Sequence, residues 1–151
     1  ILSVSCKKTN ISSCCDGNPQ VATIDSCVIA MPDIFTPNGD GINDMLFVLH
    51  RNIATIHLTV SKKFGKKVFE TTDIATGWDG NIEGKEAREK EFSYTLDATT
   101  INGASLSLSG SVCIIRDNCA KGPVENCFFQ SQFTGYAFDP TLLGESIENC
   151  E

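Results

Sequence analysis

The run Ile53-Ala54-Thr55-Ile56-His57-Leu58-Thr59-Val60 alternates between apolar and polar side chains. Successive side chains of a β-strand point to opposite faces, so this alternation predicts a strand with one buried face. Ile56, Leu58 and Val60 would face the core, and the intervening threonines and His57 would face solvent. The run Phe92-Ser93-Tyr94-Thr95-Leu96 has the same period and predicts a second strand of this kind.

Short β-rich segments recur on both sides of these two runs. They are residues 27–31, the continuous apolar run 45–49, residues 68–69, and residues 106–115 with Gly110 as a candidate bulge. Asn102-Gly103 is a hairpin-turn signal, whereas the charged residues 83–91 predict a solvated loop, with one helical turn as the alternative. Six or seven short strands at this spacing predict an all-β fold: an Ig-like antiparallel β-sandwich with disulfide-pinned, irregular N- and C-terminal segments.

Composition excludes several classes of protein. The chain has 151 residues, of which 41% are hydrophobic and 21% charged, as in an ordinary globular domain. Its net charge of −7 argues against a nucleic-acid partner, which would require a surplus of lysine and arginine. Only His50 and His57 are present, and there is no nucleophile elbow, phosphate loop or zinc-protease motif, so we expect no enzyme activity.

Eight cysteines form two clusters, in residues 6–27 and 113–150. This number favours structural disulfides in an exported protein, because reducing compartments remove the benefit of pairing. Zinc is the competing interpretation, but it would favour C-x-x-C spacing, which does not occur. The candidate disulfide partners are Cys14, Cys15, Cys27, Cys113, Cys119, Cys127 and Cys150.

The first residues, Ile1-Leu2-Ser3-Val4-Ser5-Cys6, resemble the end of a bacterial lipoprotein signal peptide. The resemblance implies a covalent lipid on Cys6 and attachment to a membrane through that lipid. The alternative is a first β-strand, because Leu2 and Val4 alternate with serines. The even number of cysteines bears on the choice between these two interpretations. Lipidation of Cys6 would leave seven thiols, and one of them would have no partner within the chain.

These features divide the chain into three parts. Residues 1–27 are a lipobox-like start and tether, residues 28–116 are the sandwich, and residues 117–151 are a tail rich in cysteine and aromatic side chains. We expect the tail to pack on the sandwich. The alternative is that its aromatic side chains form an exposed docking surface for a partner.

One loop carries oxygen-bearing side chains at close spacing. Asn38, Asp40, Asn43 and Asp44 lie within seven residues, and Gly39 and Gly41 would let the backbone turn sharply. Hard oxygen ligands of this kind suit Ca²⁺, which makes the four residues a candidate calcium site. The alternative is a structural turn in which the side chains accept hydrogen bonds from their own backbone.

Residues 32–44 read Pro32-Asp33-Ile34-Phe35-Thr36-Pro37-Asn38-Gly39-Asp40-Gly41-Ile42-Asn43-Asp44. They closely resemble the opening of the gliding-motility-associated C-terminal domain of Bacteroidota, also called the type B sorting domain of type IX secretion. Further family landmarks follow in order: Phe64-Gly65-Lys66-Lys67-Val68-Phe69-Glu70, Gly77-Trp78-Asp79-Gly80, Gly84-Lys85, Phe92-Ser93-Tyr94 and Gly110-Ser111-Val112-Cys113-Ile114-Ile115-Arg116.

Two departures from the family pattern affect the expected function. Lys62-Lys63-Phe64-Gly65 stands where the family has an arginine-tryptophan-glycine motif. Family members normally end at the arginine, whereas 35 residues follow Arg116 here. A sorting signal read at the chain terminus would be masked by such a tail, so the resemblance implies the fold more directly than it implies sorting.

The leading hypothesis is a non-catalytic interaction module of the cell envelope. It would be a lipoprotein of the outer membrane or cell surface, acting as an accessory subunit whose partners are envelope proteins such as an outer-membrane barrel or a secretion complex. The alternative is the sorting or anchoring domain of a type IX secretion cargo, an adhesin or a protein related to gliding motility. A weaker third hypothesis is a hydrolase or carbohydrate-binding module.

Overall fold

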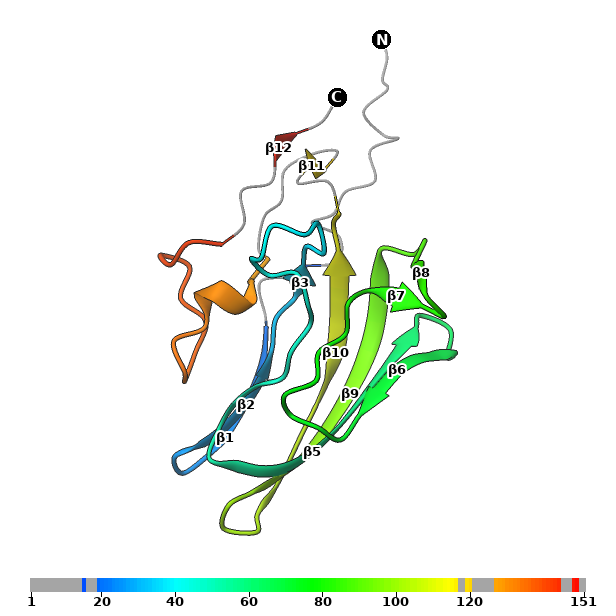
Figure 1. Ribbon diagram of the computed structural model, residues 1–151. Coiled ribbons are helices and arrows are strands. Elements are labelled where there is room, and N and C mark those ends of the chain that lie inside the picture. The colour runs from blue at the N-terminus through cyan, green and yellow to red at the C-terminus, as the bar shows by residue number, and fades with distance from the viewer. Residues whose placement is uncertain (1–14, 16–18, 117–118, 121–126, 145–147, 150–151) are drawn as a thin grey trace.

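The computed structural model describes residues 15, 19–116, 119–120, 127–144 and 148–149, and their fold is all-β (Figure 1). A three-stranded sheet has the order β1 (Gln20–Ile24), β2 (Cys27–Met31), β4 (Leu49–Arg51). A five-stranded sheet has the order β3 (Ile34–Phe35), β10 (Ser105–Ile114), β9 (Glu91–Thr100), β5 (Ile53–Lys62), β6 (Lys67–Thr71). Two small pairs complete the strands: β7 (Asn81–Ile82) with β8 (Lys85–Glu86), and β11 (Cys119–Ala120) with β12 (Glu148–Asn149). The predicted fold class is therefore confirmed.

The two alternating runs form the central strands of the larger sheet. In β5, Ile56, Leu58 and Val60 are buried, whereas His57 is exposed. In β9, Phe92, Tyr94 and Leu96 are buried in the same way, and burial raises the pKa of the Tyr94 hydroxyl. The antiparallel register pairs Leu58 with Leu96, so the two apolar faces coincide. The alternation in the sequence therefore predicts correctly which face of these two strands is buried.

Both sheets contribute to one apolar core. Ile29 and Met31 enter it from β2, and Phe92 and Leu96 enter it from β9. Trp78 lies at its centre, with ring centroids 4.9 Å from Phe92 and 5.7 Å from Phe35. This packing gives the sandwich its two layers.

Some predicted strands differ from the observed ones. Residues 45–49 do not form one strand, because Leu46 exchanges backbone hydrogen bonds with Trp78 at an isolated bridge and β4 begins only at Leu49. The expected solvated loop over residues 83–91 instead contains β8 and the start of β9. Gly110 is not a bulge: it pairs in register with Tyr94. A Cβ at that position would lie 2.8 Å from the Tyr94 hydroxyl oxygen, so the glycine makes room for the tyrosine.

Two features of the sheets were not anticipated. The strand β1 lies within the segment expected to be a tether, and its five residues pair with β2 in continuous register. The strand β3 runs parallel to the end of β10, so the sandwich is not purely antiparallel. The chain leaves β2 through Asp33 and enters β3 almost at once, and the carbonyl of Asp33 accepts a hydrogen bond from the Cys113 N–H.

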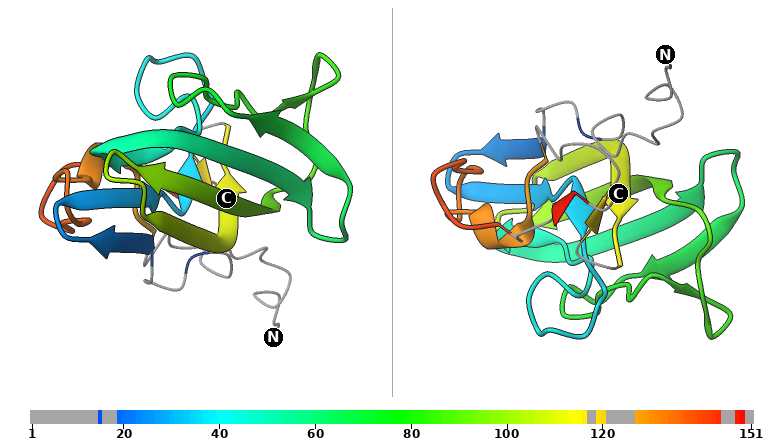
Figure 2. Two further views of the ribbon diagram at one scale, coloured as in Figure 1. Left: turned by 90° about the horizontal axis from the view of Figure 1, so that it is seen from below. Right: turned by 90° about the horizontal axis from the view of Figure 1, so that it is seen from above.

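The C-terminal lobe, residues 127–144, packs beside the three-stranded sheet (Figure 2). Phe129 is buried with Ile34 and Ile115, and the Asp33 N–H donates to the carbonyl of Phe128. Tyr136 remains exposed, with the Arg51 guanidinium 4.3 Å from its ring centroid. The aromatic residues of this lobe therefore divide between the interior and the surface.

Among the described cysteines, some form the expected disulfides and one does not. Cys15 and Cys127 form a disulfide across 112 residues, and Cys113 is also disulfide-bonded. Cys27 is a buried free thiol, so its assignment as a disulfide candidate was wrong; its strand lies between β1 and β4, neither of which contains a cysteine. Cys6, Cys14, Cys150 and the side chain of Cys119 lie outside the described residues. Within the described part of the chain, no helix has the length and hydropathy needed to cross a bilayer.

Candidate recognition surface

The loop of residues 36–44 directly follows β3 and closes upon itself. The Thr36 N–H donates to the carbonyl of Asn43 at 2.7 Å, and the Thr36 hydroxyl lies 3.4 Å from the carbonyl oxygens of Ile42 and Asn43. Thr36 is fully buried, whereas Ile42 is 53% exposed. The loop is therefore anchored at its base and presents its tip to solvent.

Asp44 organises the tip of this loop. Its Oδ1 accepts hydrogen bonds from the N–H groups of Asn38 and Gly39, and its Oδ2 accepts one from Gly41 at 2.7 Å. Asp40 accepts from the Ile42 N–H at 2.9 Å. Gly39 and Gly41 adopt φ values of +82° and +84°, which side chains with a Cβ rarely adopt. The carboxylates thus hold a backbone shape that the glycines permit.

These contacts account for the shape of the loop without a metal ion. A Ca²⁺ ion needs six to eight oxygen ligands, and both oxygens of Asp44 already accept hydrogen bonds from backbone N–H groups. The Asn38 side-chain oxygen accepts from the Asp40 N–H, and the nearby Asp79 accepts from the N–H of Asn81. Among the described residues, no cluster of three His, Cys, Asp or Glu side chains could hold a metal ion. The geometry favours the structural turn.

Asp44→Ala is expected to loosen the tip without unfolding the sandwich. Three N–H groups lose a charged acceptor, and we expect the free energy of unfolding to fall by about 1–2 kcal/mol. Hydrogen exchange of the Gly39 and Gly41 amides should accelerate by at least about tenfold. Asp40→Ala is the matched control, whose main effect should fall on the Ile42 amide. Unchanged exchange at Gly39 and Gly41 in Asp44→Ala would contradict the assignment.

A second family landmark lies against the base of this loop. The Trp78 indole N–H donates to the carbonyl of Asn81 at 2.9 Å, and Arg116 Nη2 donates to the carbonyl of Gly80 at 2.8 Å. Gly80 has φ +82°, and a Cβ there would lie 3.1 Å from Arg116 Nη2 and 3.5 Å from Pro37. Arg116 is thus held against this turn. Motifs far apart in the sequence converge at one end of the sandwich.

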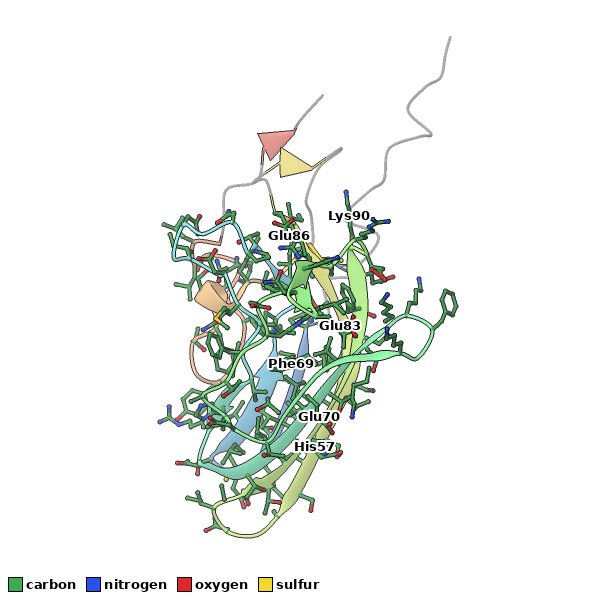
Figure 3. All side chains as sticks on the ribbon, turned by 45° about the vertical axis from the view of Figure 1, so that its right-hand side comes forward. His57, Phe69, Glu70, Glu83, Glu86 and Lys90 are labelled. Atoms are coloured by element: carbon green, nitrogen blue, oxygen red, sulfur yellow. A yellow bond between two sulfur atoms is a disulfide. The ribbon has the colours of Figure 1, made fainter. Side chains whose placement is uncertain are left out.

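The two histidines do not form a catalytic arrangement with each other. His57 on β5 contacts Glu70 on β6 across the sheet, with Nε2 and Oε2 2.5 Å apart, and Figure 3 shows both side chains on the sheet surface. Hydrogen bonds from Lys67 and then from His57 lower the pKa of the Glu70 carboxyl. His50 lies on β4 in the other sheet. The absence of enzyme activity stays a prediction.

The loop is also fastened to the C-terminal lobe. The Asn43 side-chain amide donates to the Ser131 hydroxyl, and the Ser131 N–H donates to Asn43 Oδ1, both at 3.2 Å. The Ser131 hydroxyl in turn donates to the carbonyl of Leu143. Ser131 was not foreseen as a site residue, because 88 residues separate it from Asn43 and no local pattern marks the contact. Loop and lobe therefore present one continuous surface.

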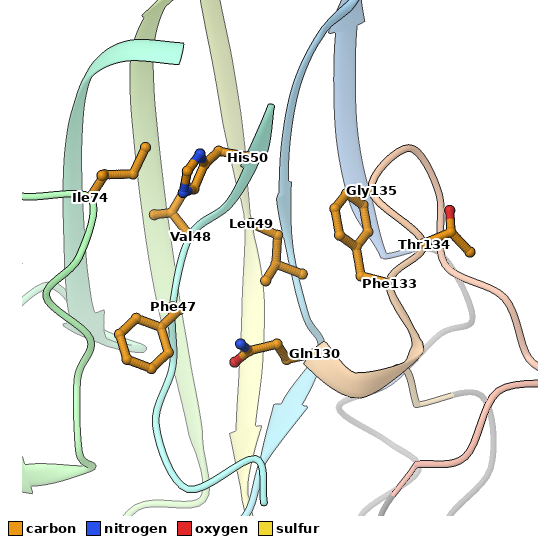
Figure 4. Close-up of a pocket in the computed structure, with 9 residues that line it drawn as sticks. All are labelled: Phe47, Val48, Leu49, His50, Ile74, Gln130, Phe133, Thr134 and Gly135. Carbon is orange, nitrogen blue, oxygen red and sulfur yellow. The ribbon is translucent and has the colours of Figure 1, made fainter. Parts of the chain in front are cut away.

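A groove follows the seam between the sandwich and the lobe (Figure 4). One hollow of about 530 Å³ lies along residues 47–50 and is bounded by Ile74, Phe133 and Gly135. A second hollow of about 410 Å³ lies beside Ile42 and shares Phe47 and Gln130 with the first. The first hollow has no acidic or basic side chain in its lining apart from His50. We refer to residues 36–50 and 127–144 together as the recognition surface.

Comparison with known families gives a match. The family model described as the CHU_C type IX secretion signal domain matches residues 29–114. The matched segment runs from β2 to the last residue of β10, and it includes the loop of residues 36–44 and the Trp78 turn. It covers more than half of the chain. No curated protein matches the sequence.

Proposed function

Because the chain belongs to the family of type IX secretion signal domains, we propose that it directs export by this route. It would be a sorting domain that the secretion machinery recognises as a folded module. Membership of the family implies a protein that is secreted or displayed on the cell surface. The match over residues 29–114 is the observation that carries the proposal.

The recognition surface is the part of the domain that we propose the machinery reads. It contains residues 36–44 of the longest family motif, and its loop is held in one shape by Asp44 and by the contact with Ser131. A preorganised surface loses little conformational entropy on binding. Residues 127–144, which follow the family arginine, also form part of this surface, because Ser131 is hydrogen-bonded to Asn43.

The family match favours sorting over the accessory lipoprotein subunit. Lipid on Cys6 lies outside the described residues, and nothing in the described fold depends on it. An oxidising destination agrees with the disulfide between Cys15 and Cys127, since such bonds persist outside the cytoplasm.

Substitution of the exposed tip tests this site. In a strain with type IX secretion, we expect Ile42→Asp to lower the export of a reporter fused to the full chain by about tenfold, because a charge enters the proposed contact. Ile101→Asp, at a position on the β9–β10 turn that is also more than half exposed, is the matched control and should leave export unchanged. Equal export by both variants would remove the recognition surface from the proposal, and the family assignment would stand.

A further inference from the structure

The turn between β5 and β6 presents a phenylalanine to solvent. Phe64 is 96% exposed, more than any other large hydrophobic residue in the described part of the chain. The turn is ordered by hydrogen bonds: the Lys62 N–H donates to the carbonyl of Lys66 at 2.8 Å, and the Gly65 N–H donates to the carbonyl of Lys62 at 2.9 Å. Gly65 has φ +104°, which lets the chain reverse directly after Phe64. The backbone therefore holds Phe64 away from the core.

Four lysines surround this phenylalanine: Lys62, Lys63, Lys66 and Lys67. We call residues 62–67 the basic tip. Three of the lysines have carboxylate partners: Lys62 with Glu89 and Lys63 with Glu91, each at 2.9 Å, and Lys67 with Glu70 at 2.7 Å. Such exposed ion pairs are weak. The ammonium groups can therefore exchange these partners for other anions at little cost.

The charge of the tip contrasts with that of the rest of the chain. Residues 62–70 contain four lysines and Glu70, a formal charge of +3, and counting the paired Glu89 and Glu91 leaves +1. The whole chain carries −7, so the residues outside this cluster carry −8. A negatively charged surface would repel the body of the protein and attract the tip, which would orient the molecule with Phe64 leading.

We propose that the basic tip docks this protein on an anionic lipid surface. The lysines bind the headgroup phosphates, and Phe64 enters the boundary between headgroups and acyl chains. Juxtaposed lysines gain energy from anionic lipids, and an aromatic side chain gains more by leaving water at that depth. The inference is independent of sorting, because binding to lipid requires no secretion machinery.

The same sheet offers a matched control at its other end. The register pairs Lys62 with Phe92 and Ile53 with Thr100, so the β9–β10 turn lies opposite the basic tip. Ile101 on that turn is 61% exposed, and residues 100–104 carry no charge. It is an exposed apolar side chain on a hairpin without the lysines. If the protein docks on lipid through the basic tip, Phe64 should enter the membrane and Ile101 should remain in water.

The test measures binding of the full chain to vesicles. We expect the partition coefficient to be about tenfold higher for vesicles of equal phosphatidylcholine and phosphatidylglycerol than for pure phosphatidylcholine. Phe64→Ala should lower binding about tenfold. Lys66→Gln should lower it about fivefold, whereas Arg51→Gln should not, because Arg51 precedes the end of β5 that pairs with Thr100, away from the tip. Roughly 0.5 M NaCl should abolish most of the binding.

Fluorescence locates the inserted side chain. After subtraction of the Trp78 signal of the unsubstituted chain, the emission of Phe64→Trp should shift to shorter wavelength on the anionic vesicles and be quenched by brominated lipid, while Ile101→Trp should show neither effect. Circular dichroism of each variant checks that the fold is retained. Equal binding to neutral and anionic vesicles, no binding at all, or insertion of Ile101→Trp in place of Phe64→Trp would each overturn the proposal.

Discussion

Replacing Trp78 with alanine is expected to lower the free energy of unfolding by about 4 kcal/mol. The indole is 2% exposed and lies against Phe92, Phe35 and Phe69, so its loss leaves a cavity at the centre of the core. The carbonyl of Asn81 also loses the hydrogen bond that it accepts from the indole N–H. Urea unfolding followed by circular dichroism measures the change, since the substitution removes the sole tryptophan.

Phe64→Ala is the control for this prediction. It also removes a large aromatic side chain, but one that is almost wholly exposed, so the free energy of unfolding should change by less than about 0.5 kcal/mol. A loss below about 1.5 kcal/mol in Trp78→Ala would contradict the central position of Trp78.

The second large effect concerns the disulfide between Cys15 and Cys127. The double variant Cys15→Ala/Cys127→Ala is expected to lose about 3–5 kcal/mol, because the bond closes a loop of more than a hundred residues in the unfolded chain. The loss should be accompanied by proteolysis within the lobe of residues 127–144, since the bond ties this lobe to the N-terminal side of the sandwich. Chemical denaturation and limited proteolysis measure the two effects.

Cys27→Ala is the control for the loss of the disulfide, because it measures the cost of removing a buried sulfur atom that is not bonded to another. Cys27 is as buried as Cys15 but unbonded, so we expect a loss of only about 1 kcal/mol and no new cleavage. If the double variant were as stable as Cys27→Ala, the disulfide would not hold the lobe in place.

The sequence predicted the strands whose faces differ in polarity. In β5 and β9 each buried residue is followed by a more polar one, so the period alone identifies the inner face. The strand β1 was missed, because Gln20-Val21-Ala22-Thr23-Ile24 has little alternation and is stabilised by pairing with β2. The run 45–49 is uniformly apolar, and nothing local indicates that Leu46 pairs with Trp78, 32 positions later.

The sequence identifies the residues of the candidate loop but leaves both a metal site and a structural turn open. The spacing of Asn38, Asp40, Asn43 and Asp44 suits either a metal or a turn, and only the positions of the backbone N–H groups decide between them. The contribution of Ser131 depends on long-range packing of the lobe. The even number of cysteines likewise could not show that Cys27 stays unbonded, because disulfide pairing depends on which strands are neighbours.

The most direct measurement of the proposed function is export of a reporter that carries this chain at its C-terminus. We predict that a bacterium with type IX secretion places the fusion outside the cell or on its surface, and that an otherwise identical strain without the type IX translocon retains it in the periplasm. The reporter alone should be retained in both strains. Equal export of the fusion in the two strains, or retention in both with the fusion folded, would contradict a sorting role.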